Sequence, residues 1–414
     1  MAFDDFSEPE TLGMSRERLD RIPEFYRKNY LDTKKLPNIS TLVARGGEVV
    51  HLSCQGVKDW DTGEPVTADT IYRIYSMTKP VTSVAAMMCF EEGLLRLEHP
   101  VSRYIPSFKK LKVWKGGTAD APELVDCEQE MMVKDLFLHT SGLTYDFLGL
   151  HPVEKLYIDK KVIRKNHSLA DMCEMLSDIP LLFQPGTRWN YSVAIDVLGH
   201  LVEIVSGQSL DEFFRTRIFE PLGMVDTGFT IPTSKLDRFA SCYARNPLTK
   251  EITLADKGDE TSSYCREGKD PQRLLSGGGG LVSTLSDYLN FCRMLAGGGE
   301  LNDVRLLSPK TVEYMMSNHL PGGSTMGGMG DEMFSESNMA GNGFGLGGAV
   351  VVDPILMNQP SSEGTFSWGG LASTFFWIDP EEDMIGIQMT QMIPSSSYPI
   401  RPQFQQLAYA SIIV

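Results

Sequence analysis

The sequence predicts an α+β fold in which one antiparallel sheet is built from both ends of the chain and helices fill the middle. Short apolar runs typical of strands occur at residues 40–54 and again at 347–389. Apolar residues at helical spacing dominate residues 168–219. Helices and strands do not alternate as they do around a doubly wound parallel sheet, so we expect an antiparallel sheet with flanking helices and an inserted, mostly helical subdomain.

The expected elements follow from apolar periodicity and from turn residues between them. The expected helices are 15–30, from Ser76 to about Gly93, 132–138, 196–205, 286–295 and 402–414. The expected strands are 40–44, 49–54, 347–352, 365–368, 373–378 and 385–389, the first two joined at Gly46-Gly47. Residues 107–130 are polar, charged and contain glycine, as expected of a surface insertion. Residues 237–270 are polar with weak periodicity, so we assign them no regular structure.

This order of elements divides the chain into two parts. Residues 1–105 and 275–414 would form the sheet domain, and residues 106–274 the helical subdomain, with a surface insertion around 107–131. Clefts form where such parts meet, so we expect the active site at their junction.

Composition excludes several functional classes. The chain has 414 residues, 42% of them hydrophobic, and a net charge of −16, which disfavours a nucleic-acid binder. Its first residues resemble no signal peptide and no apolar run is long enough for a membrane span, so we expect a cytoplasmic protein. The seven cysteines are scattered, which indicates reduced thiols. Neither Cys-x-x-Cys nor His-Glu-x-x-His occurs, so we expect no metal site, and we expect no cofactor.

Residues 76–79, Ser-Met-Thr-Lys, place a hydroxyl and an amine three residues apart at the start of an apolar helix. Residues i and i+3 share a helix face, so Ser76 and Lys79 can meet near the positive end of the helix dipole. A serine becomes a nucleophile beside a base, and a lysine can be that base where its surroundings favour the neutral amine. The stretch therefore predicts a nucleophile and its base.

The spacing alone is weak evidence, because Ser-x-x-Lys is expected by chance about once or twice in a chain of this length. A second copy, Ser107-Phe-Lys-Lys110, does occur. It lies in a Pro- and Lys-rich stretch with no apolar helix behind it, so we interpret it as a solvated loop.

Two other stretches carry candidate chemistry. Tyr191 precedes an apolar helix and can relay a proton; the alternative is a core aromatic at a helix start. In residues 367–371, Ser-Trp-Gly-Gly-Leu, two glycines within a strand indicate that something approaches the backbone closely. An N–H of this strand and the N–H of Ser76 would form an oxyanion hole, and the alternative is a β-bulge.

Several other motifs are interpreted as structural. Tyr288-Leu-Asn290 falls in the middle of a helix, and His139 precedes Thr-Ser-Gly at a helix end, where a structural hydrogen bond is expected. The run Gly277–Gly280 lacks the Lys-Ser/Thr of a phosphate-binding loop and predicts a tight turn packed against other backbone. No Gly-x-Ser-x-Gly occurs, which excludes the nucleophile elbow of α/β-hydrolases.

The order of the motifs resembles that of the class C β-lactamase-like serine hydrolases and penicillin-binding proteins. The matching stretches are Ser76-Met-Thr-Lys79, His139-Thr-Ser-Gly142, Gln184 to Ser192, Glu220-Pro-Leu-Gly-Met224, Gly279-Gly-Leu-Val-Ser283 and Trp368-Gly-Gly370. Within that superfamily the chain is most similar to the family VIII carboxylesterases, from about residue 15 to its end. The resemblance implies an α/β sandwich of the β-lactamase type.

The resemblance also implies roles for the matching residues. Ser76 would be the nucleophile, Lys79 its base, and Tyr191 would share proton transfer to the leaving group. The backbone N–H groups of Ser76 and Leu371 would form the oxyanion hole. The residues expected to contact the substrate are Trp368, Gly369, Gly370, Tyr145 and Phe147, and loops 145–150 and 321–342 are expected to line the pocket.

Two departures from the family's pattern suggest the substrate. Val193 stands where class C β-lactamases have Asn, and Trp368 stands where they have Lys. Without that lysine a β-lactam carboxylate lacks a charged partner, whereas a tryptophan offers an apolar surface. We therefore expect a serine carboxylesterase that hydrolyses short-chain neutral esters through an acyl-enzyme on Ser76.

Other functions remain open at this point. A β-lactamase, a D-amino-acid peptidase or an acyltransferase would use the same site, and a catalytically silent binding domain would keep only the fold. The expected partner is a small-molecule ester, with neither nucleic acid nor membrane.

Overall fold

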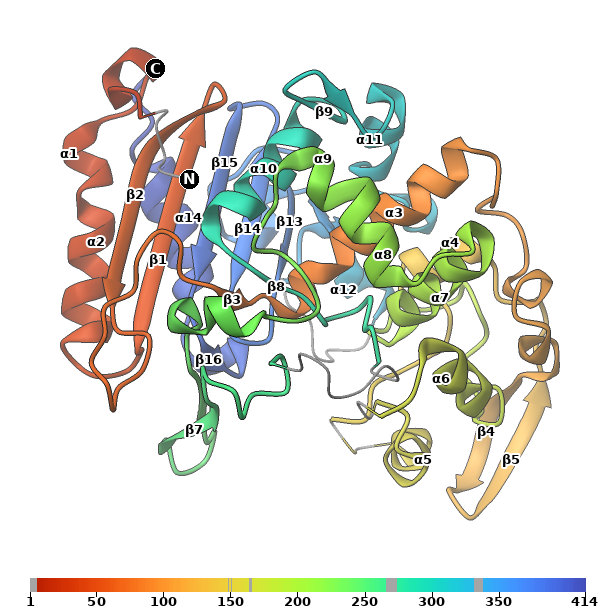
Figure 1. The fold of residues 1–414 in the computed structure, drawn as a ribbon. Helices are drawn as coiled ribbons and strands as arrows, with labels where there is room; N and C mark the ends of the chain where they lie inside the picture. Colours follow the sequence, from red (N-terminus) through yellow and green to blue (C-terminus); the bar gives the residue numbers. More distant parts are fainter. Residues whose placement is uncertain (1–5, 148, 150, 164–165, 266–273, 331–337) are drawn as a thin grey trace.

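A seven-stranded antiparallel sheet forms one side of the molecule, the left side in Figure 1. The computed structural model describes residues 6–147, 149, 151–163, 166–265, 274–330 and 338–414. The strand order β11-β12-β13-β14-β15-β1-β2 places the first two strands of the chain beside the last ones. Their bounds are β1 Asn38–Arg45, β2 Glu48–Gly56, β11 Asn342–Phe344, β12 Ala349–Val351, β13 Phe366–Gly369, β14 Phe375–Asp379 and β15 Met384–Met389. The predicted α+β class, with a sheet built from both chain ends, is confirmed.

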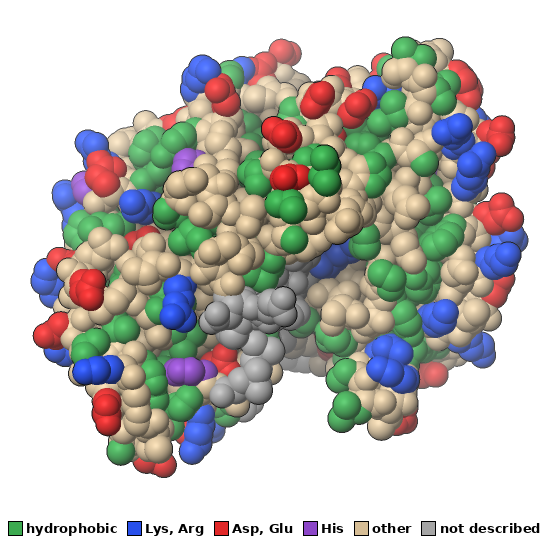
Figure 2. Space-filling model, turned by 180° about the vertical axis from the view of Figure 1, so that it is seen from behind, with side chains coloured by type: hydrophobic (Ala, Val, Ile, Leu, Met, Phe, Trp, Pro, Cys, Tyr) green, Lys and Arg blue, Asp and Glu red, His purple; other side chains and the backbone are tan. Residues whose placement is uncertain are grey.

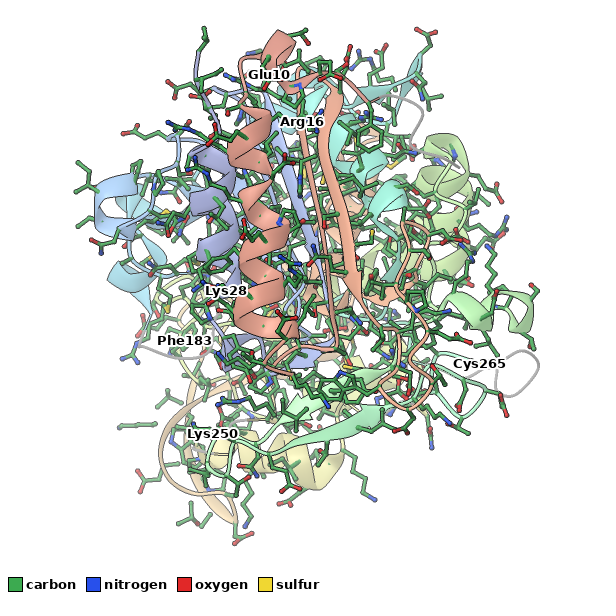
Figure 3. All side chains as sticks on the ribbon, turned by 90° about the vertical axis from the view of Figure 1, so that its left-hand side faces the viewer. Glu10, Arg16, Lys28, Phe183, Lys250 and Cys265 are labelled. Carbon is green, nitrogen blue, oxygen red and sulfur yellow. The ribbon has the colours of Figure 1, made fainter. Side chains whose placement is uncertain are left out.

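Helices from distant parts of the chain cover the two faces of the sheet. On one face lie α1 (Arg16–Leu19) and α2 (Arg21–Tyr26) beside α14 (Ile400–Tyr409), as Figure 3 shows from the side. The Tyr26 hydroxyl donates to the Ile400 carbonyl over 2.8 Å and so joins the two chain ends. On the other face, α10 (Leu285–Ala296) packs against β15. The apolar core of the molecule therefore lies on both sides of the sheet.

The remaining elements gather beside this sheet, around the central helix α3 (Thr78–Glu91), which packs against α7 (Ala194–Ser206). The other helices are α4 Val133–Phe137, α5 Pro152–Lys160, α6 Leu169–Leu176, α8 Leu210–Phe214, α9 Glu220–Leu222, α11 Pro309–Met315, α12 Met326–Met329 and α13 Pro354–Met357. The short strands are β3 Tyr72–Arg73, β4 Lys112–Thr118, β5 Ala121–Asp126, β6 Cys242–Arg245, β7 Ile252–Asp256, β8 Val282–Ser283, β9 Glu300–Leu301, β10 Val304–Arg305 and β16 Met392–Ile393.

Local sequence signals explain several element ends. Gly46 and Gly47 have φ values of 60° and 78°, the left-handed conformation that a two-residue hairpin turn requires, and this confirms the predicted β1–β2 hairpin. The Ser15 hydroxyl accepts from the Arg18 N–H and caps α1. Gly207, with φ 71°, ends α7 where the sequence predicted a stop.

Two segments without a predicted structure contain hairpins. Residues 107–130 contain the β4–β5 pair, and residues 237–270 contain β6 and β7. Most side chains of β4, β5 and β7 are exposed on both faces, so the alternation of apolar and polar residues that identifies a half-buried strand is missing. The structure thus adds hairpins that the sequence analysis did not predict in either segment.

The molecular surface is mixed in character. Figure 2 shows acidic and basic side chains interspersed with apolar ones over one face. Among the residues described, no helix is both long and apolar enough to cross a membrane.

Candidate active site

Ser76 lies in a sharp turn at the start of α3. A 3₁₀ turn, Tyr75–Met77, leads directly into the helix, and Tyr75 has a φ of 43°, which is uncommon for a residue with a side chain. Tyr288 of α10 is completely buried and stabilises this turn. Its hydroxyl donates to the Met77 carbonyl over 2.9 Å. Tyr288 is therefore structural, as predicted, while Ser76 remains 9% exposed.

Lys79 is completely buried one helical turn further along α3. Its Nζ lies 3.1 Å from the Ser76 Oγ, 3.1 Å from the Tyr145 hydroxyl and 2.6 Å from the Gly278 carbonyl oxygen. In the neutral form, an amine in this position can accept the Ser76 proton. The structure thus brings together the two residues that the Ser-x-x-Lys spacing selected, and it adds Tyr145 as a direct neighbour of the amine.

Tyr191 lies just before α7, with its ring centroid 4.5 Å from the Lys79 Nζ. The His139 ring packs against it at 4.8 Å, and the His139 Nδ1 lies 3.2 Å from the Ser192 Oγ. Burial, and secondarily the charge of Lys79, hold the pKa of His139 well below its ordinary value. His139 is thus a neutral ring that packs behind Tyr191, in agreement with its expected structural role.

The position of Trp368 corrects the expectation that its ring contacts the substrate. Trp368 is completely buried and does not line the pocket. Its indole N–H instead donates to the Tyr191 hydroxyl over 3.3 Å. The sequence identified an apolar side chain here, but it could not tell that the indole turns toward Tyr191.

Gly369 and Gly370 are buried, and neither position has room for a side chain. A Cβ on Gly369 would lie 2.4 Å from the Arg401 guanidinium carbon, and one on Gly370 would lie 2.2 Å from the Ile74 carbonyl oxygen. The two glycines therefore allow close packing of β13 against α14 and against the turn that carries Ser76.

The next residue, Leu371, reaches the wall of the same pocket as Ser76. Because Gly370 packs directly against Ile74, two residues before Ser76, the backbones of the two segments lie side by side. N–H groups from two such segments can stabilise one developing oxyanion.

A pocket of about 620 Å³ opens above Ser76. Tyr145 and Phe147 lie on its wall with their rings stacked at 4.8 Å, and Phe147 is 52% exposed. Of loop 145–150, residues 148 and 150 lie outside the described part of the chain, as do residues 331–337 of loop 321–342. The described residues of loop 321–342 do not line this pocket.

The sequence analysis missed much of the pocket wall. The additional lining residues include Ile163, Asp196, Asp256, Tyr264, Leu274 and Ser276. Asp256 ends β7 and pairs with the fully buried Arg73 over 2.6 Å, which anchors this wall to β3. No motif marks these residues. The available signal was Arg73, a charged residue within the apolar run that precedes Ser76.

The glycine run Gly277–Gly280 forms a tight turn between α3 and α7. The Thr82 hydroxyl donates to the Gly277 carbonyl over 2.7 Å, and a Cβ on Gly277 would lie 2.9 Å from the Ile195 carbonyl oxygen. The prediction of a turn packed against other backbone is confirmed, and its Gly278 carbonyl faces Lys79.

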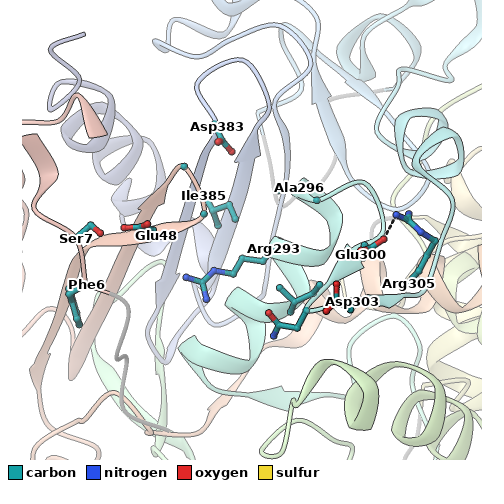
Figure 4. Close-up of a pocket in the computed structure, with 15 residues that line it drawn as sticks. Phe6, Ser7, Glu48, Arg293, Ala296, Glu300, Asp303, Arg305, Asp383 and Ile385 are labelled. Atoms are coloured by element: carbon teal, nitrogen blue, oxygen red, sulfur yellow. Dashed lines mark hydrogen bonds and ion pairs between the residues drawn. The ribbon is translucent and has the colours of Figure 1, made fainter. Parts of the chain in front are cut away.

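A larger hollow of about 1010 Å³ lies elsewhere, between the N-terminal segment, the β1–β2 turn and the end of α10 (Figure 4). Charged side chains such as Glu48, Arg293 and Asp303 surround it. Ser7 supplies the sole hydroxyl side chain among its described lining residues, which include no lysine. It therefore lacks the nucleophile and base that the pocket above Ser76 contains.

Comparison with known proteins agrees with this geometry. The Beta-lactamase family model matches residues 26–410. The chain is 33% identical to protein Rv1367c of Mycobacterium tuberculosis over 88% of both chains, and 30% identical to the esterase EstB of Burkholderia gladioli over 84% of both. The solved structure of EstCE1, described as a hydrolase with promiscuous acyltransferase activity, is 27% identical with a TM-score of 0.76, and covers 96% of this chain and 99% of its own. The chain therefore belongs to the beta-lactamase family, in the serine β-lactamase-like superfamily that includes the family VIII esterases, and is a serine hydrolase or acyltransferase of that fold.

Proposed function

We propose that this protein is a serine carboxylesterase that hydrolyses neutral esters through an acyl-enzyme on Ser76. The observation that carries the proposal is the 3.1 Å contact between the Lys79 Nζ and the Ser76 Oγ at the base of a pocket. A buried amine beside a serine hydroxyl is the arrangement that nucleophilic catalysis requires. Similarity to the esterase EstB supports the reaction class.

The proposed mechanism assigns one step to each neighbour of Ser76. Lys79, as the neutral amine, takes the hydroxyl proton while the Ser76 Oγ attacks the ester carbonyl carbon. The N–H groups of Ser76 and Leu371 hold the oxyanion. Tyr191 then delivers its proton to the leaving alkoxide and takes one back from the Lys79 ammonium, and a water molecule releases the acyl group by the reverse sequence.

The charge of the pocket disfavours an anionic substrate, since aspartates such as Asp146 and Asp256 line it. No arginine or lysine lines the pocket among the described residues. A substrate carboxylate would therefore lack a charge-assisted contact, which is typically worth about 1.5–3 kcal/mol, or roughly one to two decades in rate. An ester also has a better leaving group, an alkoxide, than an amide has, so less acid assistance from Tyr191 is needed.

The test compares both substrate classes on one enzyme preparation. We expect kcat/KM for p-nitrophenyl acetate or butyrate to exceed that for a cephalosporin by at least about two decades. The Ser76→Ala variant serves as the background for both assays. Comparable efficiencies, or a preference for the β-lactam, would contradict the proposal of neutral esters as substrates. Neither result would contradict nucleophilic catalysis by Ser76.

Acyl transfer is a second candidate, favoured by the similarity to EstCE1 and by the size of the pocket. A cavity of about 620 Å³ leaves space for an acceptor alcohol beside a short acyl group. The assay measures the ester formed from vinyl butyrate in the presence of an added alcohol, against the free acid. Exclusive release of acid at high alcohol concentration would reject transfer.

A silent binding domain is the competing explanation of a different class. A fluorophosphonate probe, with intact-mass analysis of the wild type and Ser76→Ala, distinguishes the two. We expect one label on the wild type and none on the variant, whereas an unlabelled wild type would reject the esterase proposal.

A further inference from the structure

Asp196 is a buried carboxylate that the mechanism above does not use. It lies in the first turn of α7, is 4% exposed and reaches the pocket beside Ser276 and Gly278. Its Oδ1 accepts a hydrogen bond from the Ser276 Oγ at 2.5 Å and another from the Gly278 N–H at 3.0 Å. Burying a carboxylate is costly unless opposite charge and hydrogen bonds compensate it, so its position calls for a partner.

The Gly278 residue connects this carboxylate to the catalytic amine. Its N–H donates to Asp196, and its carbonyl oxygen accepts from the Lys79 Nζ at 2.6 Å. A Cβ on Gly278 would lie 2.5 Å from the Asp196 Oδ2, so the close approach requires glycine. The Gly278 backbone therefore connects the carboxylate to the amine through two hydrogen bonds, one from its N–H and one to its carbonyl oxygen.

Lys79 and Asp196 are groups of opposite charge on either side of Gly278, and Asp146 and Asp256 are the other carboxylates that line the same pocket. Tyr145, Tyr191 and His139 face Lys79, and the pKa of His139 lies well below its ordinary value, chiefly through burial. Cys173 faces Asp196, and burial together with the carboxylate raises the pKa of that thiol. Burial raises the pKa of Asp196, while the Ser276 hydrogen bond and the charge of Lys79 oppose that rise.

We propose that Asp196 is a positioning residue that acts as the counter-charge of Lys79 and, through Gly278, holds the amine at the Ser76 hydroxyl. Its effect on the reaction rests on the proposed esterase function. Asp196 would act only through Lys79, without touching the substrate.

The first test is the pH dependence of kcat/KM for p-nitrophenyl butyrate. Asp196→Asn keeps the shape of the side chain and removes the charge that favours the ammonium form of Lys79. The neutral amine should then persist to lower pH, so the acidic limb of the kcat/KM profile should move to lower pH by about half to one unit. Ser276→Ala is the matched control, since it removes a hydrogen bond and keeps the charge, and its limb should stay in place. An unmoved limb in Asp196→Asn would overturn the proposal, because a merely structural role lowers activity without moving the limb.

The second test needs no turnover. Lys79→Met leaves the Asp196 carboxylate buried without its counter-charge, so adding Asp196→Asn should raise the melting temperature of Lys79→Met by about 2 °C or more. Ser276→Ala combined with Lys79→Met should instead lower the melting temperature further, because it removes a hydrogen bond from the buried carboxylate and keeps its charge. Additive effects of Lys79→Met and Asp196→Asn would refute the charge pairing even if the enzyme is an active esterase. Should Asp196→Asn not fold, Asp196→Ser removes the same charge with a smaller side chain.

Discussion

The two Ser-x-x-Lys copies share a spacing and differ in everything around them. Lys79 is completely buried, whereas the Lys110 side chain is 60% exposed. Ser107 donates its hydroxyl to the Glu174 carboxylate over 3.0 Å, and Lys110 forms an ion pair with Asp178. In the second copy the hydroxyl and the amine are therefore directed to separate carboxylates rather than to each other.

The difference shows that enclosure, and not spacing, selects the reactive copy. The direct neighbours of the Lys79 Nζ include a serine hydroxyl, a tyrosine hydroxyl and a backbone carbonyl. An exposed ion pair such as Lys110–Asp178 contributes about 0–1 kcal/mol to stability and gives no pocket for a substrate. The same four-residue pattern is thus a candidate catalytic pair in one place and, in the other, a serine and a lysine that bind separate carboxylates at the surface.

Replacing the two serines gives the sharpest contrast. Ser76→Ala should lower kcat for p-nitrophenyl butyrate by at least about four decades, since it removes the nucleophile itself. Ser107→Ala should retain activity near that of the wild type, because its hydroxyl binds only Glu174. Both variants should melt close to the wild type in a thermal scan. An inactive Ser107→Ala would reverse the assignment.

The lysines should separate almost as clearly. Lys79→Ala and Tyr191→Phe should each lower kcat by about three decades, and the double variant should be little worse than the poorer single one, because groups that act as a unit are non-additive. Lys110→Ala is the matched surface control. Near-normal turnover by Tyr191→Phe would return Tyr191 to the alternative of a core aromatic.

Burial should also control how stability responds to pH. Burial, aided by the charge of Arg16, lowers the pKa of His51 to about 4, below its unfolded value of about 6.5. Between these values the unfolded state binds the extra proton, so stability is complete above pH 6.5 and falls by about 3 kcal/mol on acidification to pH 4. Urea titrations at several pH values measure this slope. His51→Gln should flatten it, and an unchanged slope would show that other groups titrate there.

The smallest expected effect concerns Trp368. Trp368→Phe removes the hydrogen bond to Tyr191 and should lower kcat by about three- to tenfold with little change in KM, because the indole does not line the pocket. Trp377→Phe is the matched control, since the Trp377 indole nitrogen is buried without a hydrogen-bond partner in the structure. A change confined to KM would restore the expectation that Trp368 contacts the substrate.

The sequence predicted what local patterns encode and missed what only tertiary contacts create. The Gly46-Gly47 hairpin and the Ser76 helix start follow from turn chemistry and apolar periodicity, and both are present. Asp196 resembled an ordinary carboxylate in the first turn of a helix, because its contact with Gly278 joins segments about eighty residues apart. The β7 wall of the pocket escaped notice since its exposed side chains show no burial pattern.

The two sides of the pocket have different architectural origins. Its floor is built from the turn that carries Ser76, the glycine turn and Leu371 after β13, and a side chain added at Gly277, Gly278 or Gly370 would meet neighbouring protein atoms. Its outer wall comes from residues such as Phe147, Ile163 and Tyr264, which lie outside the seven-stranded sheet. Substitutions in the outer wall can therefore change which ligands enter the pocket, while the catalytic residues at its floor stay the same.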